Sequence, residues 1–515
     1  MTVFVVGLDG ADWSLLRRWA SDGDLSAIES ITADGVAGDL QSTLPPITFP
    51  AWKCYSTGKN PGKLGVYEWF RFDRDDHAID TNDSSTFQSR EYWDVLADHG
   101  LTPAVVNMPT THPPNTDDGV LTVAGSPATE RGEFTKPASL KTDLLDAVPG
   151  YRVKPDLVLD EAAADELVDE ARTLADQRFD AAEWLADDRD ADLVHLTVFV
   201  TDTVQHRLWD RPDAIRRLYE RIDERIGELL ARDDAGAVFL MSDHGFAEID
   251  QSFFVNQWLA ERGHLAFEES SARGALAGLG LTEERLKRVV DRLGLVNVAQ
   301  ALVPESLQRL FPSESGLTAV QDAALDWERT RAISLGRGPI YLNDAAFESQ
   351  AERDAFRDEL ADDLASLTTP AGDPVAEAVH RPEEVYTGPL DAAPDLVVEY
   401  ATGVDAPESV GGDVFGTNTA WLATHRTTGI FAGVGADLAD ADADLSLYDL
   451  APTILHYLGV PVPEDADGEV RRDVFAGGPA ERDVEYGPPT ATGGGGRGAG
   501  AEVEETLRNL GYMEK

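Results

Sequence analysis

Several side chains that can bind metal ions stand just after short apolar runs. Asp9 follows the run Val3–Leu8, and Asp243 and His244 follow the run Ala237–Met241. Carboxylate oxygen and imidazole nitrogen are the ligand types of sites that hold two zinc or two manganese ions. An aspartate after a strand also often caps the next helix, and for Asp9 taken alone the two interpretations stand equally open. The Ser-Asp-His-Gly context of Asp243 favours the metal site.

A third pair of possible ligands follows another apolar run. Asp202 comes after Leu193–Val200, and His206 stands four residues further on. In open α/β sheets, ligands bind beyond the carboxyl ends of the strands. The three groups of residues are therefore expected to meet at one edge of a sheet.

Two further motifs complete the set. One runs from Pro45 to Trp52, contains Thr48, and is followed by Thr57-Gly58; the other places His425 just before an apolar strand. Five motifs thus occur in a fixed order: Gly-Leu-Asp9-Gly, Thr48-Phe49-Pro50, Asp202-x-x-x-His206, Ser-Asp243-His244-Gly and His425. This order resembles the type I phosphodiesterase/nucleotide pyrophosphatase branch of the alkaline-phosphatase superfamily. The resemblance spans most of the chain.

The resemblance implies two divalent ions, zinc or alternatively manganese, held by residues of this pattern. One ion would be bound by Asp202, His206 and His425. The other would be bound by Asp9, Asp243 and His244, together with the Thr48 hydroxyl.

The chemistry that such a site implies starts with Thr48. A threonine hydroxyl is a poor nucleophile at neutral pH, and coordination to a divalent ion favours its alkoxide. A phosphothreonine would form and would then be hydrolysed by water. The backbone N–H of Phe49 is a candidate donor to the developing negative charge.

The sequence departs from the family pattern around the substrate. Nucleotide pyrophosphatases carry a phosphate-contacting asparagine about twenty residues after the threonine, where this chain has Trp69. Ala51 stands where the family often has asparagine, and Leu64 where it has histidine. The expected substrate contacts are Phe49, Trp69 and Asn107. Lys53, Lys59 and Asn60 remain open as alternative donors.

The elements that must position these residues follow from hydropathy. Short β-branched runs read as strands buried on both faces, as in a parallel sheet. They are Val3–Leu8, Pro103–Val106, Leu193–Val200, Ala237–Met241 and Leu396–Glu399. Helical patterns lie between them, at Glu161–Arg189 and Pro212–Ala231. The fold class predicted is α/β, a doubly wound and mostly parallel sheet of the alkaline-phosphatase type with a helical insertion.

The chain divides into three expected regions. Residues 1–252 and 330–480 form the catalytic α/β domain, and residues 253–329 form a helical insertion or cap. Residues 481–515 form a glycine-rich linker and a short C-terminal helix.

Composition bounds the environment and the partners. The formal net charge is -51, so a nucleic-acid partner is not expected. The acidic residues are spread along the chain and do not form a tail, and eight of the 43 basic residues are lysine, as in proteins of halophilic archaea. A single cysteine, Cys54, excludes an intrachain disulfide and a paired-cysteine metal site. Without a signal peptide or a membrane-spanning run, the expectation is a cytoplasmic protein.

The predicted activity is hydrolysis of a phosphodiester or nucleotide pyrophosphate bond in a small phosphorylated substrate. The alternatives are a phosphomutase or phosphomonoesterase of the same superfamily, and a non-catalytic binding protein stabilised by metal. A binding protein has no need for the nucleophile Thr48, which favours an enzyme. The sequence gives no expectation for the oligomeric state.

The charge yields a testable prediction about salt. Because 94 acidic residues oppose 43 basic ones, self-repulsion at low ionic strength should destabilise the compact state. We expect the thermal unfolding midpoint to rise as potassium chloride increases from millimolar to molar concentrations. A midpoint that does not change with salt would contradict the halophilic interpretation and would leave the catalytic one untouched.

Overall fold

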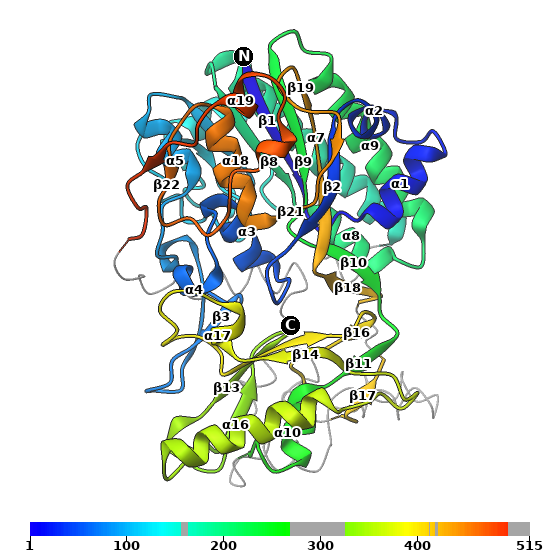
Figure 1. Ribbon diagram of the computed structural model, residues 1–515. Coiled ribbons are helices and arrows are strands. Elements are labelled where there is room, and N and C mark those ends of the chain that lie inside the picture. Colours follow the sequence, from blue (N-terminus) through cyan, green and yellow to red (C-terminus); the bar gives the residue numbers. More distant parts are fainter. Residues whose placement is uncertain (156–162, 268–324, 411, 418–420, 493–515) are drawn as a thin grey trace.

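The structure, a computed structural model, describes residues 1–155, 163–267, 325–410, 412–417 and 421–492 (Figure 1). Residues 268–324 of the expected helical insertion, and residues 493–515 of the expected glycine-rich linker and C-terminal helix, lie outside these ranges.

A ten-stranded sheet lies in the upper part of the molecule in Figure 1. Its centre is β1 (Thr2–Leu8), which pairs in parallel with β8 (Leu193–Val198) on one side and β9 (Ala235–Met241) on the other. β5 (Pro103–Val106) continues the parallel pairing beyond β8. The complete order is β20-β2-β19-β9-β1-β8-β5-β6-β7, with β21 paired to β2. The outer strands are β2 (Val36–Gln41), β6 (Leu121–Val123), β7 (Thr135–Lys136), β19 (Thr428–Gly435), β20 (Ala441–Asp442) and β21 (Leu445–Ser446).

Helices cover both faces of this sheet, because its central strands are apolar on both sides. In β1, Phe4 and Val6 pack into one hydrophobic core, whereas Val3 and Val5 pack into the other. The first core includes residues of α1 (Trp13–Ser21), α2 (Ser26–Asp34), α7 (Ala164–Asp188) and α9 (Pro212–Leu230). The second includes residues of α3 (Thr48–Thr57), α5 (Tyr92–Asp98) and α18 (Leu450–Tyr457). The predicted doubly wound, mostly parallel α/β fold is confirmed.

A smaller antiparallel sheet forms the lower part of the molecule (Figure 1). Its order is β12 (Ala332–Ser334), β13 (Pro339–Leu342), β15 (Leu396–Tyr400) and β14 (Ala376–His380). Helix α16 (Gln350–Ala365) packs against it. The run Leu396–Glu399 is thus a strand, but its assignment to a parallel sheet is wrong, since β15 pairs antiparallel with β13 and β14. A short apolar run shows that a strand is buried and does not show the direction of its neighbours.

The remaining elements connect and extend these two sheets. The helix expected at Glu161–Arg189 corresponds to α7, which the structure describes from Ala164 to Asp188. The helix expected at Pro212–Ala231 corresponds to α9 (Pro212–Leu230). Within 253–329, the structure describes α10 (Val255–Glu261) and the flanking residues to 267 and from 325. None of the described helices is long and apolar enough to cross a membrane. Other elements are α4 (Pro61–Leu64), β3 (Phe70–Phe72), β4 (Ile79–Thr81), α6 (Leu140–Ala147), α8 (Val200–Leu208), β10 (Gly245–Glu248), β11 (Gln251–Phe253), α17 (Pro382–Val385), β16 (Val404–Asp405), β17 (Phe415–Gly416), β18 (Ala423–Arg426), β22 (Val462–Pro463), α19 (Gly478–Glu481) and β23 (Tyr486–Gly487).

Candidate active site

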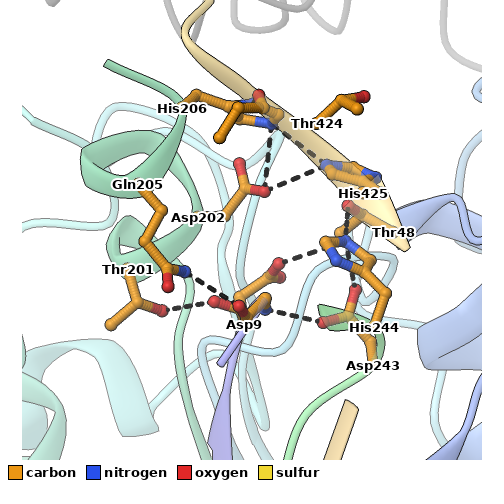
Figure 2. A network of polar contacts seen from close by, with 12 residues as sticks. Asp9, Thr48, Thr201, Asp202, Gln205, His206, Asp243, His244, Thr424 and His425 are labelled. Carbon is orange, nitrogen blue, oxygen red and sulfur yellow. Dashed lines mark hydrogen bonds and ion pairs between the residues drawn. The ribbon is translucent and has the colours of Figure 1, made fainter. Parts of the chain in front are cut away.

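Five of the predicted ligands stand at the carboxyl ends of three adjacent strands. Asp9 directly follows β1, and Asp243 and His244 follow β9, its neighbour in the sheet. Asp202 and His206 lie on α8, which begins two residues after β8. Their spacing of four residues places both on one face of that helix. Figure 2 shows the side chains converging from these three elements.

Thr48 and His425 reach the same place from other elements. Thr48 is the first residue of α3, and its Oγ1 lies 3.0 Å from Nε2 of His244. The first hydrogen bond of this helix runs from Ala51 N–H to the Ile47 carbonyl, 3.0 Å away. The N–H groups of Thr48 and of the next residue therefore precede the helical ladder and point toward its N-terminal end, where an anion is stabilised. His425 lies in β18, which pairs antiparallel with β10, the strand that begins at Gly245 of the Ser-Asp-His-Gly motif.

The three histidines have their tautomers fixed by backbone carbonyl groups. Their Nδ1 atoms lie 2.7 Å from Ala423 O for His206, 2.9 Å from Pro46 O for His425 and 3.2 Å from Gly245 O for His244. A carbonyl oxygen can only accept a hydrogen bond, so Nδ1 carries the proton and donates it. Each Nε2 therefore presents a lone pair to the site, as in a metal-ligating histidine.

These lone pairs face one another and a carboxylate. The Nε2 atoms of His206 and His425 are 3.0 Å apart, and each lies 3.2 Å from Oδ1 of Asp202. Burial lowers the pKa of His206, so its imidazole is neutral at neutral pH. Two lone pairs and a carboxylate at this distance repel one another unless a cation lies among them. The geometry therefore fits a metal ion.

The other carboxylates lack partners in the same way. Asp9 Oδ2 accepts a hydrogen bond of 2.8 Å from Trp52 Nε1, and Asp243 Oδ1 accepts one of 3.1 Å from Gly10 N–H. Among the described residues, the second oxygens, Asp9 Oδ1 and Asp243 Oδ2, have no hydrogen-bond partner although both are buried. Burial, and after it the charge of neighbouring carboxylates, raises the pKa of Asp9 well above its usual range. Burial does the same for the pKa of Asp243.

The potential ligand atoms fall into two overlapping groups. Within each group the atoms lie within 4.8 Å of one another: Asp202, His206 and His425 form one, and Asp9, Asp202 and His244 form the other. Asp202 belongs to both, which the sequence did not indicate. Asp243, predicted for the second group, has its unpaired Oδ2 3.2 Å from Nε2 of His244. The chemistry of the donor set in both groups is that of a two-metal site.

Comparison with known proteins places the chain. Residues 3–425 match the type I phosphodiesterase / nucleotide pyrophosphatase family. The chain belongs to this family. It is therefore a phosphohydrolase of the alkaline-phosphatase superfamily. No curated protein is similar enough to the sequence to count as a match.

Solved structures share the fold of this family member at low sequence identity. Phosphonoacetate hydrolase from Sinorhizobium meliloti 1021, in complex with phosphonoformate, superposes with a TM-score of 0.56 at 15% identity, covering 88% of this chain and 94% of its own. Murine ectonucleotide pyrophosphatase/phosphodiesterase 5 gives a TM-score of 0.53 at 13% identity, covering 92% and 100%. An inactive variant of the same murine protein in complex with AMP gives 0.54 at 13%, covering 92% and 99%.

Three residues that position the site of this phosphodiesterase-family protein were not predicted from the sequence. Trp52 binds Asp9 Oδ2, and Thr201 Oγ1 donates to the Asp9 carbonyl at 2.7 Å. Asp12 accepts a hydrogen bond from Arg426 Nε at 2.6 Å and thereby ties β18 to the turn after β1. Trp52 could have been found, since it stands four residues after Thr48, one helical turn away on the same face.

The predicted substrate contacts lie in different surroundings. Phe49 and Trp69 pack on each other in the core, with ring centres 4.5 Å apart, and both side chains are buried. Asn107 follows β5 in a left-handed conformation, with φ of 59°, and its buried Oδ1 has no partner among the described residues. It lines a cavity of about 20 Å³ with Ser126, Arg178 and other residues. That cavity is large enough for a water molecule. Substrate binding by these three residues stays a prediction.

The alternative donors are engaged elsewhere. Lys53 forms a buried ion pair of 2.7 Å with Glu91, and Lys59 pairs with Asp465. Asn60 caps α4 by accepting from Gly62 N–H. These contacts are structural.

The raised pKa values predict an unusual effect of Asp243→Asn. Because its folded pKa is raised, the metal-free protein should lose stability as pH rises above the usual aspartate range, where the unfolded chain has already released the proton. Asparagine keeps the acceptor for Gly10 and removes the charge. We expect the thermal midpoint of the chelator-treated protein at pH 7 to rise by roughly 2–4 °C, while metal binding is lost. The control is Asp449→Asn, a carboxylate remote from this cluster. A lower midpoint for Asp243→Asn than for this control would contradict the interpretation.

Proposed function

We propose that the protein hydrolyses a phosphodiester or nucleotide pyrophosphate bond through a phosphothreonine on Thr48, with two divalent ions, zinc or manganese. The observation that carries the proposal is the place of the Thr48 hydroxyl, 3.0 Å from His244 Nε2 and beside a buried cluster that presents only acceptor atoms. A hydroxyl next to such a cluster becomes a nucleophile once cations fill it.

We assign the ligands to the two ions as the family pattern implies. Asp202, His206 and His425 would hold one ion, and Asp9, Asp243 and His244 the other. When bound, the ions favour the Thr48 alkoxide and neutralise charge on the phosphoryl oxygens.

The protein's own groups then account for the reaction. Thr48 Oγ1 forms a bond to phosphorus as the bond from phosphorus to the leaving oxygen breaks. The N–H groups at the start of α3 face the phosphoryl oxygens, and the helix dipole adds to their effect. Water then attacks phosphorus, the bond to Thr48 breaks, and its hydroxyl is regenerated with release of the phosphate product.

The similar structures support this choice over the alternatives. The murine relative is an ectonucleotide pyrophosphatase/phosphodiesterase, and its inactive form, with threonine replaced by alanine, was solved in complex with AMP. The bacterial relative is a phosphonoacetate hydrolase. A nucleotide substrate with a threonine-dependent mechanism is therefore proposed here before mutase or monoesterase activity.

The nucleophile is tested by substitution at Thr48. Thr48→Ala removes the hydroxyl and no charged ligand, so we expect metal to remain bound while turnover of bis-p-nitrophenyl phosphate falls by at least about 1000-fold. Thr48→Ser should keep part of the activity. Acid quenching followed by peptide mass spectrometry should find phosphate on Thr48. Thr43→Ala is the matched control, because Thr43 is also buried and its hydroxyl bonds to Pro45 O. Near-normal turnover in Thr48→Ala would make a water molecule the direct attacker.

The metal assignment is tested by stoichiometry. Bound zinc or manganese should approach two ions per chain, and His206→Ala should lose about one. His99→Ala is the control, because His99 also points Nδ1 at a backbone carbonyl, that of Val95, and is not part of the cluster. A folded protein that is active in chelator without divalent metal would refute the assignment.

A further inference from the structure

A cavity of about 90 Å³ lies between the edge of the large sheet and the smaller sheet, next to the cluster of ligands. Pro46, His425 and Arg426 line it from the catalytic side, and Arg337 and Tyr400 line it from the smaller sheet. Because His425 is one of its walls, a group that leaves the phosphorus atom beside His425 would enter this cavity.

Arg337 lies in the turn before β13, and this turn places its side chain at the cavity. Its neighbours Gly336 and Gly338 have φ of +91° and +146°, conformations that favour glycine. A Cβ at Gly336 would lie 2.1 Å from a carboxylate oxygen of Glu68, and one at Gly338 would lie 2.8 Å from Pro45. Only glycines let this turn press against the segment that leads to Thr48.

Two contacts hold the Arg337 guanidinium, one at its Nε edge and one on its planar face. Its Nε donates to Oδ1 of the fully buried Asp405 at 2.7 Å, and the same oxygen lies 3.3 Å from Thr424 Oγ1. The guanidinium carbon lies 3.9 Å from the ring centre of Trp421. The His206 ring centre lies 3.5 Å from the same tryptophan. Two planar groups this close to one ring must take opposite faces, so Trp421 is sandwiched between the arginine and the ligand histidine.

This arrangement leaves the outer edge of the guanidinium uncommitted. Among the described residues, neither terminal amino group of Arg337 donates a hydrogen bond, although the side chain is 24% exposed and lines the cavity. A planar fork of N–H donors is the geometry that binds phosphate or carboxylate through two parallel hydrogen bonds. Burial raises the pKa of the adjacent Glu68 to about 8, so at neutral pH that group is mostly protonated and does not cancel the arginine charge.

We propose that Arg337 binds an anionic group on the leaving part of the substrate, and thereby selects substrates whose leaving group carries a further phosphate or carboxylate over those with a neutral leaving group. This rests on the proposed function and narrows its substrate class to pyrophosphate-type compounds and similar anions. Asp405 and Trp421 are the residues that position the arginine.

The test compares two substrates that share the transferred group. Thymidine triphosphate leaves pyrophosphate, whereas the p-nitrophenyl ester of thymidine monophosphate leaves a group without a phosphate. We expect Arg337→Met to lower kcat/KM for the triphosphate at least about 30-fold and for the ester less than about threefold. A carboxylate-bearing phenyl ester of the same nucleotide shows whether a carboxylate is accepted in place of phosphate.

Matched variants guard against loss of folding. Arg337→Met/Asp405→Asn also removes the buried negative charge that Arg337 balances in the unchanged protein, and should show the same substrate selectivity. Arg353→Met is the control, because Arg353 likewise pairs with Asp395 in the smaller sheet region and does not line the cavity. It should affect neither substrate.

Several outcomes would overturn the proposal. Equal losses on both substrates would mean that Arg337 acts only through Trp421 and His206. Faster hydrolysis of a choline ester than of the triphosphate would assign the cavity to a cation, since Glu377 and Glu399 also line it. A binding measurement without turnover distinguishes failure of this proposal from failure of the proposed function. In calorimetry on the Thr48→Ala protein, adding Arg337→Met should weaken binding of thymidine triphosphate and leave binding of thymidine monophosphate unchanged. Equal weakening of both nucleotides would refute the proposal whatever the enzyme hydrolyses.

Discussion

The structure depends on a cluster of carboxylate oxygens and imidazole nitrogens whose lone pairs face one another at one edge of the large sheet. Asp9, Asp202 and Asp243 are buried there with three imidazoles whose donor nitrogens are turned away to backbone carbonyls. Such an arrangement repels itself without cations, so the surrounding fold must hold it in place. Parallel pairing of β8, β1 and β9 fixes the carboxylates in register, and Trp52 and Thr201 hold Asp9 from both sides. Repulsion at the site lowers the stability of the folded protein, and packing in the two hydrophobic cores around the site offsets that loss.

The sequence reveals the centre of the fold better than its margins. The runs that became β1, β8 and β9 are apolar on both faces, a pattern that strands in the middle of a parallel sheet share with few other elements. In the smaller sheet, the sequence predicted only β15. β14, for example, has one buried residue followed by four exposed or half-buried ones, so hydropathy does not distinguish it from a loop. β15 was recognised as a strand, but nothing local to it encodes the antiparallel neighbours supplied by residues before and after it.

The candidate site divides in the same way. Asp202 and His206 are visible because a helix turns their four-residue spacing into a shared face, and Asp243 and His244 because they are adjacent. His425 stands far from all of them along the chain and was placed by the order of family motifs alone. Arg337 could not be predicted from the sequence, because its partners Asp405 and Trp421 are distant from it along the chain and contact it only in the folded protein.

This division suggests how the two sheets share the work. Thr48 and five of the six proposed metal ligands come from the large sheet and the segments that follow its strands, and His425 comes from β18, which pairs with β10 directly after the strand β9. The turn that carries Arg337 belongs to the smaller sheet; it contacts Pro45, in the segment before Thr48, and Arg337 lines the cavity beside His425. Substitutions of the smaller sheet's side chains that line the cavity can change what lies beside the leaving group without moving the carboxylates. The exception is the stack of Arg337, Trp421 and His206, through which a change on the smaller sheet can still reach a proposed metal ligand. Variation in substrate preference should accordingly be easiest at cavity residues outside that stack, such as Glu377 and Tyr400, because their side chains can change without disturbing the histidine.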